Sequence, residues 1–291
     1  MRKYVFQSVL DQLPECFADA MLLDVAVEKS LADLRQRRIN DTGRGNGAPP
    51  VFHKSMNKAV VVAAVGGIEA FFETLAVQAK EIAEPLPENG NDWYTITGRK
   101  GEIQTPSPRN IRKLFWSIFH VDLMESWDLS ITASETDTGE GNGTWRSRHN
   151  YRHTGPDAFA FLDATVKIRH SFAHGDPSQS RRAVGMAHEG VNGGYSVASH
   201  HAFNAVSAAL QAAIQSTLYL ADSLGLPYTP KPRWKVSWEN VRGQNIGLDY
   251  WLRGAPVWEE IVTWKGAPTD EHDPNVDLQD ADGVPAFVDP M

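Results

Sequence analysis

The stretch from Ala59 to Phe72 reads AVVVAAVGGIEAFF and is apolar almost all round. A helix that is apolar on every face is normally buried, because only a protein core covers all of its sides. Ser55, a suitable N-cap residue, precedes the stretch, and prolines 85 and 87 follow it. We therefore predict a central buried helix from about residue 55 to residue 83.

Four further segments place apolar residues at helical spacing. The predicted helices cover residues 15–38, 107–118, 156–174 and 199–223. Residues 40–50 and 86–105 are expected to be loops, the latter with short strands as one alternative. Residues 132–155 are polar and glycine-rich, with no helical period. The sequence thus predicts an all-α bundle of about five helices.

The pattern changes after residue 230, where five of the nine tryptophans fall within 31 residues. Their spacing is neither alternating nor helical, so we expect a small appendage of mixed or irregular structure packed on the bundle, with a hairpin as one alternative. The predicted organisation is an N-terminal helix and glycine-rich loop, a helical domain, a Trp-rich extension and an acidic tail, over residues 1–54, 55–229, 230–265 and 266–291.

The formal net charge of −8 is concentrated in the tail. Residues 266–291 hold seven acidic side chains and no Lys or Arg, which leaves 28 basic and 29 acidic residues before them. A nearly neutral body does not exclude a polyanionic ligand. We expect the tail to be a disordered, solubilising end; the alternative is that it mimics RNA over a basic cleft.

Cysteine usage and hydropathy limit the classes of protein to which the chain can belong. The single cysteine, Cys16, excludes an intramolecular disulfide and a cysteine-rich zinc site. The apolar run at residues 59–68 is short for a bilayer span, and the first residues carry no apolar signal core. We expect a cytoplasmic protein without a membrane partner.

The segment with the clearest chemistry is residues 168–175, IRHSFAHG, at the expected end of the fourth helix. Four residues separate Arg169 from His174, and Gly175 follows. Histidine titrates near neutral pH and arginine grips two phosphate oxygens at once. Side chains five positions apart diverge by about 140° on a helix. The pair therefore converges only if the helix distorts or a second subunit completes the site.

Arg-x4-His before glycine, at the end of an amphipathic helix, resembles the signature of the HEPN superfamily, most closely its RiboL-PSP group. Residues 67–72, GIEAFF, and 108–115, PRNIRKLF, are similar to two earlier helices of that family. Asp163, six residues before Arg169, also fits its pattern. The resemblance covers roughly residues 59–224, and His170 stands where the family usually has asparagine.

The resemblance implies a helical bundle that dimerises so that two Arg/His pairs face one cleft. It also implies a metal-independent RNA endonuclease, often a toxin or antiviral-defence effector, that cleaves by 2′-hydroxyl transesterification. RNA, a second copy of the chain, and an antitoxin or sensor protein are the implied partners, with no cofactor and no metal. The alternative is a non-catalytic HEPN module that binds RNA, nucleotide or a partner protein.

The expected catalytic residues are Arg169, His174 and His170, the last as participant or surface residue. Glu69 and Asn110 are supporting candidates. Glu69 is costly to bury unpaired, so it is expected to meet a partner such as Arg169, either as a structural ion pair or in the chemistry. The alternative interpretation of Asn110 is an ordinary residue in the first turn of its helix.

Residues 145–153, WRSRHNYRH, combine three arginines with aromatic rings and lack acids. This composition suits single-stranded RNA, so Arg146, Arg148, Tyr151 and Arg152 are expected RNA contacts. The alternative is a solvated loop whose rings pack on the bundle.

Pairs of histidines recur in the sequence, but without the neighbouring ligand residues that a metal site usually has. His149 with His153, and His170 with His174, stand four residues apart but have no Glu-x-x-His frame. A metal-dependent hydrolase using such pairs is a third class of function. The doublet His200-His201 is expected to cap the last helix or to be exposed.

Overall fold

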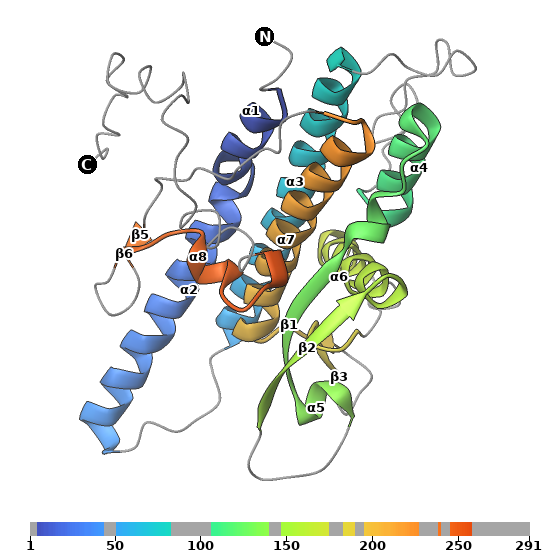
Figure 1. Cartoon of the computed structure of the whole chain (residues 1–291). Helices are drawn as coiled ribbons and strands as arrows, with labels where there is room; N and C mark the ends of the chain where they lie inside the picture. The colour runs from blue at the N-terminus through green and yellow to red at the C-terminus, as the bar shows by residue number, and fades with distance from the viewer. Residues whose placement is uncertain are drawn as a thin grey trace, which may run out of the picture.

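The computed structural model describes residues 5–43, 51–82, 106–139, 147–174, 183–189, 195–226, 238–239 and 245–257. The described part is mainly helical, with small two-stranded antiparallel sheets (Figure 1). The helices of the bundle are α1 (Val5–Asp11), α2 (Leu13–Thr42), α3 (Val51–Ile82), α4 (Pro108–Phe119), α6 (Pro156–His174) and α7 (Ser199–Ser223). The expectation of a mainly helical protein is thus confirmed.

Helix α3 is the central helix predicted from residues 59–72. It packs against α2, α6 and α7, and Figure 1 shows it running beside α7 through the middle of the molecule. Phe71 and Phe72 are fully buried. At Gly67, helices α2 and α3 approach so closely that a Cβ atom would lie 2.4 Å from the Phe17 ring and 2.8 Å from the Cys16 carbonyl oxygen. Glycine is therefore required there for α2 to pack on α3.

Residues Lys54–Ile82 of α3 are also long enough and apolar enough to cross a membrane. The most apolar window has a mean hydropathy of 1.9, and 56% of it is buried by the rest of the protein. The helix is therefore longer and more apolar than the run at residues 59–68 indicated. A core helix covered by its neighbours meets the same criterion, so this one helix is weak evidence for a membrane span.

The termini of several helices follow their local sequence. The Ser107 hydroxyl accepts a hydrogen bond from the Asn110 backbone N–H, with Pro108 in the first turn of α4. Helix α7 covers the predicted residues 199–223, and Gly225 follows it with φ of +63°. Helix α2 continues to Thr42, into the segment expected to be a loop, because Gly43 supplies the left-handed cap.

A β-hairpin interrupts the helical pattern, a feature that the all-α expectation did not include. Strands β1 (Asp128–Ser134) and β2 (Arg148–Thr154) pair antiparallel, with the short helix α5 (Glu135–Thr138) after β1, and η3 (Leu123–Ser126) precedes them. Strand β1 alternates buried Leu129, Ile131 and Ala133 with polar residues, a period-two signal that the overall polarity of residues 132–155 obscures.

The free edge of β1 is paired by side chains of α7. Gln211 donates to the Ser130 carbonyl and accepts from the Ser130 N–H, at 3.2 and 2.8 Å. Asn204 and Gln215 make the same two-way contact with Thr132 and Asp128. Three amides spaced along one face of a helix thus replace a neighbouring strand, which explains why these three polar side chains are buried.

The described part of the Trp-rich extension packs on the bundle as expected. Strands β5 (Trp238–Glu239) and β6 (Asn245–Ile246) form a hairpin, and α8 (Asp249–Leu252) lies against α7. Trp251 is buried and its indole Nε1 donates to Asp24 of α2. Trp234, Trp258, Trp264 and the acidic tail lie outside the described residues.

Candidate functional site

The Arg-x4-His segment occupies the last turns of α6. The described part of α6 extends to His174, and Arg169 and His170 are partly exposed on it. The side chain of His174 and residue Gly175 lie outside the described part of the chain, so the convergence of Arg169 with His174 stays a prediction.

Glu69 of α3 lies near Arg169 across the α3–α6 contact. Burial and the neighbouring Glu73 raise the pKa of Glu69, while the charge of Arg169 lowers it. Glu69 is partly exposed, and no direct ion pair joins it to Arg169 among the described contacts. The acidic candidate therefore lies within electrostatic reach of the arginine.

Two further residues of the resemblance have local roles. The Asn110 backbone N–H completes the cap of α4. Asp163 is paired with Lys167 one turn along α6, with its Oδ2 2.6 Å from Nζ. Both arrangements stabilise single helices.

The predicted RNA-binding segment is a strand, rather than a loop, from Arg148 onward. Its arginines do not share a face with its tyrosine, because successive strand residues point to opposite sides. Arg148 and Arg152 are exposed, and Arg152 makes a two-point ion pair with Asp128 of β1. Tyr151 belongs to the opposite face, with His153 against Phe161 of α6. Arg146 lies outside the described residues.

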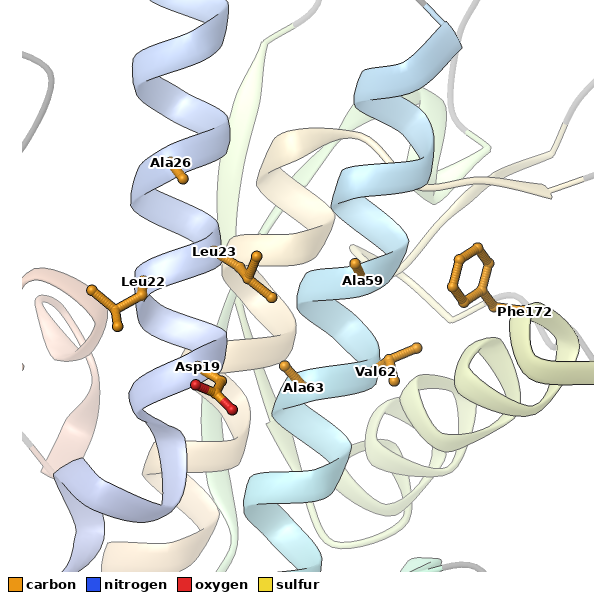
Figure 2. Close-up of a pocket in the computed structure, with 8 residues that line it drawn as sticks. All are labelled: Asp19, Leu22, Leu23, Ala26, Ala59, Val62, Ala63 and Phe172. Atoms are coloured by element: carbon orange, nitrogen blue, oxygen red, sulfur yellow. The ribbon is translucent and has the colours of Figure 1, made fainter. Parts of the chain in front are cut away.

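An apolar groove of about 590 Å³ lies between α2 and α3 and extends to the end of α6 (Figure 2). Leu23 of α2 and Ala63 of α3 lie between the two helices, and Phe172 of α6 lies on the far side of α3. Leu22 and Phe172 expose 49% and 44% of their surface. The Lys58 ammonium lies over the Phe172 ring, 5.9 Å from the ring centroid.

A cluster of one aspartate and three histidines, buried or half-buried, lies at the Ser134 end of strand β1. Asp137 belongs to α5, His188 to β3 (His188–Glu189, paired with β4, Tyr195–Ser196), and His200 and His201 to the first turn of α7. One donor atom from each side chain lies within 4.8 Å of the other three. Asp137 is 1% exposed and His201 is fully buried.

The carboxylate of Asp137 is the centre of this cluster. His201 Nε2 and His188 Nδ1 lie 2.9 and 2.7 Å from Oδ1, and His200 Nε2 lies 3.0 Å from Oδ2. Burial opposes ionisation, but the imidazole contacts hold the pKa of Asp137 well below its usual range. Burial lowers the pKa of His201 to about 4, against the opposite effect of Asp137. The arrangement is an ionised carboxylate contacted by three imidazoles, of which the buried His201 favours the neutral form.

This cluster was not predicted from the sequence. His201 does cap α7, since its Nδ1 accepts the Ala198 N–H, but it is buried and not exposed. The available local signals were the His200-His201 doublet at a helix start and the Ser134-x-x-Asp137 capping box. Only the tertiary structure brings residues 137, 188 and 200 together, because no local spacing relates them.

Comparison of the chain with models of known protein families, with curated proteins and with solved structures found no match in any of the three.

Proposed function

We propose that this protein is a metal-independent RNA endonuclease of HEPN type, acting as a homodimer in the cytoplasm. The observation that carries the proposal is that Glu69 of α3 and Arg169 of α6, both partly exposed, interact electrostatically, and that the last described turn of α6 holds His174. A toxin or antiviral-defence role, with an antitoxin or sensor partner, follows from the HEPN resemblance.

The proposed reaction uses the nucleophile that RNA itself carries. The 2′-oxygen attacks the adjacent phosphorus while His174 accepts its proton, and the bond from phosphorus to the 5′-oxygen breaks. A histidine returns a proton to the leaving oxygen, which gives a cyclic 2′,3′-phosphate and a free 5′-hydroxyl. Arg169 neutralises charge on the phosphate oxygens in the transition state, and Glu69 positions Arg169.

The geometry of a single helix favours a dimer for this chemistry. Arg169 and His174 diverge by about 140° on a regular helix, so a second α6 brings a histidine to each arginine. The apolar groove is a suitable surface for a second copy, because it is lined mainly by apolar side chains and includes the exposed Phe172 near the end of α6.

The test is cleavage of end-labelled single-stranded RNA by the full chain in the presence of EDTA. We expect cleavage products with cyclic phosphate ends, and a loss of about a hundredfold or more in rate for Arg169→Ala and for His174→Ala. Arg253→Ala removes an exposed guanidinium from the C-terminal extension and should cleave like the wild type.

The same experiment separates the competing functions. Binding of RNA without cleavage by all four proteins would overturn the enzyme and favour a non-catalytic module. Cleavage that EDTA abolishes would favour a metal-dependent hydrolase. His170→Asn, which introduces the residue usual in the family, should retain activity that His170→Ala loses if His170 takes part.

A further inference from the structure

We propose that Asp137, His188 and His200 bind one divalent transition-metal ion of the zinc class, and that His201 positions the carboxylate. The site is independent of the Arg169/His174 chemistry. Its ligands come from α5, β3 and α7, so an ion would join the β1–β2 hairpin to the first turn of the last helix.

The donor set and its dimensions suit such an ion. Imidazole nitrogen and carboxylate oxygen are ordinary ligands of zinc and of neighbouring divalent metals. Donors in a tetrahedral zinc site lie about 3.3 Å apart, since each is about 2.0 Å from the ion. The ring nitrogens here lie 2.7 and 3.0 Å from the Asp137 oxygens, so a small outward shift of the rings admits the ion.

Hydrogen bonding alone does not account for all three histidines. A carboxylate offers about four acceptor positions. The Ser134 backbone N–H and hydroxyl take two, both on Oδ2 at 2.9 Å, and His201 and His200 contact the carboxylate as well. His188 Nδ1 lies 2.7 Å from Oδ1 but makes no hydrogen bond, although the atom is buried. A buried ring nitrogen that is close to a carboxylate but off the line of a good hydrogen bond is an arrangement that a metal ion between the two atoms would satisfy.

The role of His201 follows from its tautomer. The Ala198 N–H donates to its Nδ1 at 2.9 Å, so the ring proton is on Nε2. That proton is donated to Asp137 Oδ1, and His201 has no lone pair left for a metal. His201 and Ser134 therefore orient the carboxylate, as groups behind metal ligands commonly do. Three protein ligands leave one tetrahedral position for water.

The test is titration of the untagged full chain, freed of metal by chelator and dialysed, with ZnCl2 by calorimetry and with CoCl2 by visible absorption. We expect one equivalent to bind and zinc to raise the thermal unfolding temperature. His188→Ala and His200→Ala should each weaken zinc binding by more than about tenfold. His149→Ala removes an exposed histidine of β2 and should bind like the wild type.

His188→Ala is the decisive variant, because it removes one proposed ligand and leaves the contacts of His200, His201 and Ser134 with the carboxylate. We expect the metal-free variant to remain folded while its response to zinc is lost. Absence of stoichiometric binding, or equal stabilisation of His188→Ala and wild type by zinc, would overturn the proposal and leave a hydrogen-bonded cluster alone.

A second pair of variants tests the positioning role of His201. Glutamine offers a donor for Asp137 and an acceptor for the Ala198 N–H, whereas alanine offers neither. We expect His201→Ala to weaken zinc binding, His201→Gln to recover much of it, and the cobalt spectrum of His201→Gln to keep its wild-type shape. A changed spectrum would assign His201 to the metal itself and refute the positioning role.

Discussion

The indole Nε1 of Trp251 donates a 2.9 Å hydrogen bond to Oδ2 of Asp24, 227 residues earlier in the chain. This contact joins the C-terminal extension to α2 in the interior of the protein. Asp24 is 2% exposed, and burial raises its pKa to about 7, although the Trp251 hydrogen bond opposes the shift and the charge of Glu28 adds to it.

The first prediction concerns stability and pH. Because the pKa of Asp24 is raised on folding, the folded protein binds more protons than the unfolded chain between about pH 4 and pH 7. Stability should therefore fall as pH rises through this window. Asp24→Asn keeps an acceptor for Trp251 and removes the charge, so it should be the more stable protein at pH 8, by at most about 4 kcal/mol. Urea unfolding of both proteins at pH 4, 6 and 8 measures the difference, and a pH-independent difference would contradict it.

The second prediction compares two adjacent glycines of α3. Gly67→Ala should destabilise the protein, because its Cβ would meet Phe17 and a backbone oxygen of α2. Gly66→Ala is the matched control, since nothing lies within 4 Å of the position. Alanine is the better helix former by about 1 kcal/mol, so Gly66→Ala should stabilise the fold. Thermal unfolding of the two variants should shift in opposite directions.

The third prediction concerns the amides that pair with β1. Gln211→Ala leaves the Ser130 N–H and carbonyl without their partners on α7. An unmet polar group in a protein interior costs about 1–3 kcal/mol, and we expect a loss of that size in denaturant unfolding. Gln36→Ala, which removes an exposed amide of α2, should change stability by less than about 0.5 kcal/mol. Equal effects of the two changes would show that the pairing does not stabilise the hairpin.

The fourth prediction concerns association of two copies. Phe172→Asp places a charge at the groove beside α6 and should shift a homodimer to monomer in sedimentation equilibrium. Ile39→Asp changes an apolar side chain of similar exposure, 43% against 44%, outside the residues that line the groove. It should leave the mass unchanged. A dimer that persists in Phe172→Asp would place the interface elsewhere.

The fifth prediction separates the two arginines of β2. The guanidinium of Arg152 is already paired with Asp128, whereas Arg148 is exposed at the start of the strand. Arg148→Ala should therefore weaken single-stranded RNA binding more than Arg152→Ala. It should also lower the slope of log K against log salt by about 0.7, the value for one phosphate contact of a single strand. Fluorescence anisotropy at several salt concentrations measures both quantities, and an unchanged slope for Arg148→Ala would remove this strand from the RNA surface.

Helices were predictable from sequence where the local sequence pattern agreed with the burial of the side chains in the folded protein. The all-apolar run of α3, the Ser107-Pro108 start of α4 and the Gly225 end of α7 each carry a local cause that tertiary contacts did not override. The hairpin was missed for a physical reason. Only β1 has one buried face, while β2 is almost entirely polar and depends on β1 for its pairing.

The two candidate sites differ in how much of each was visible from sequence. The Arg169/His174 segment is contiguous and lies at one helix end, so a single stretch of chain was sufficient to propose it. Asp137 and His188 carried no such signal, and each becomes notable only beside the others.

The amino-acid sequence by itself determined most helical segments of the bundle, although not α1, because helical period, caps and breakers act over a few neighbouring residues. Tertiary structure alone decided that the β1 edge is paired by amides of α7, and that one carboxylate and three imidazoles converge at the start of that helix. Such convergence depends on how distant segments pack against each other, and packing is a property of the whole chain.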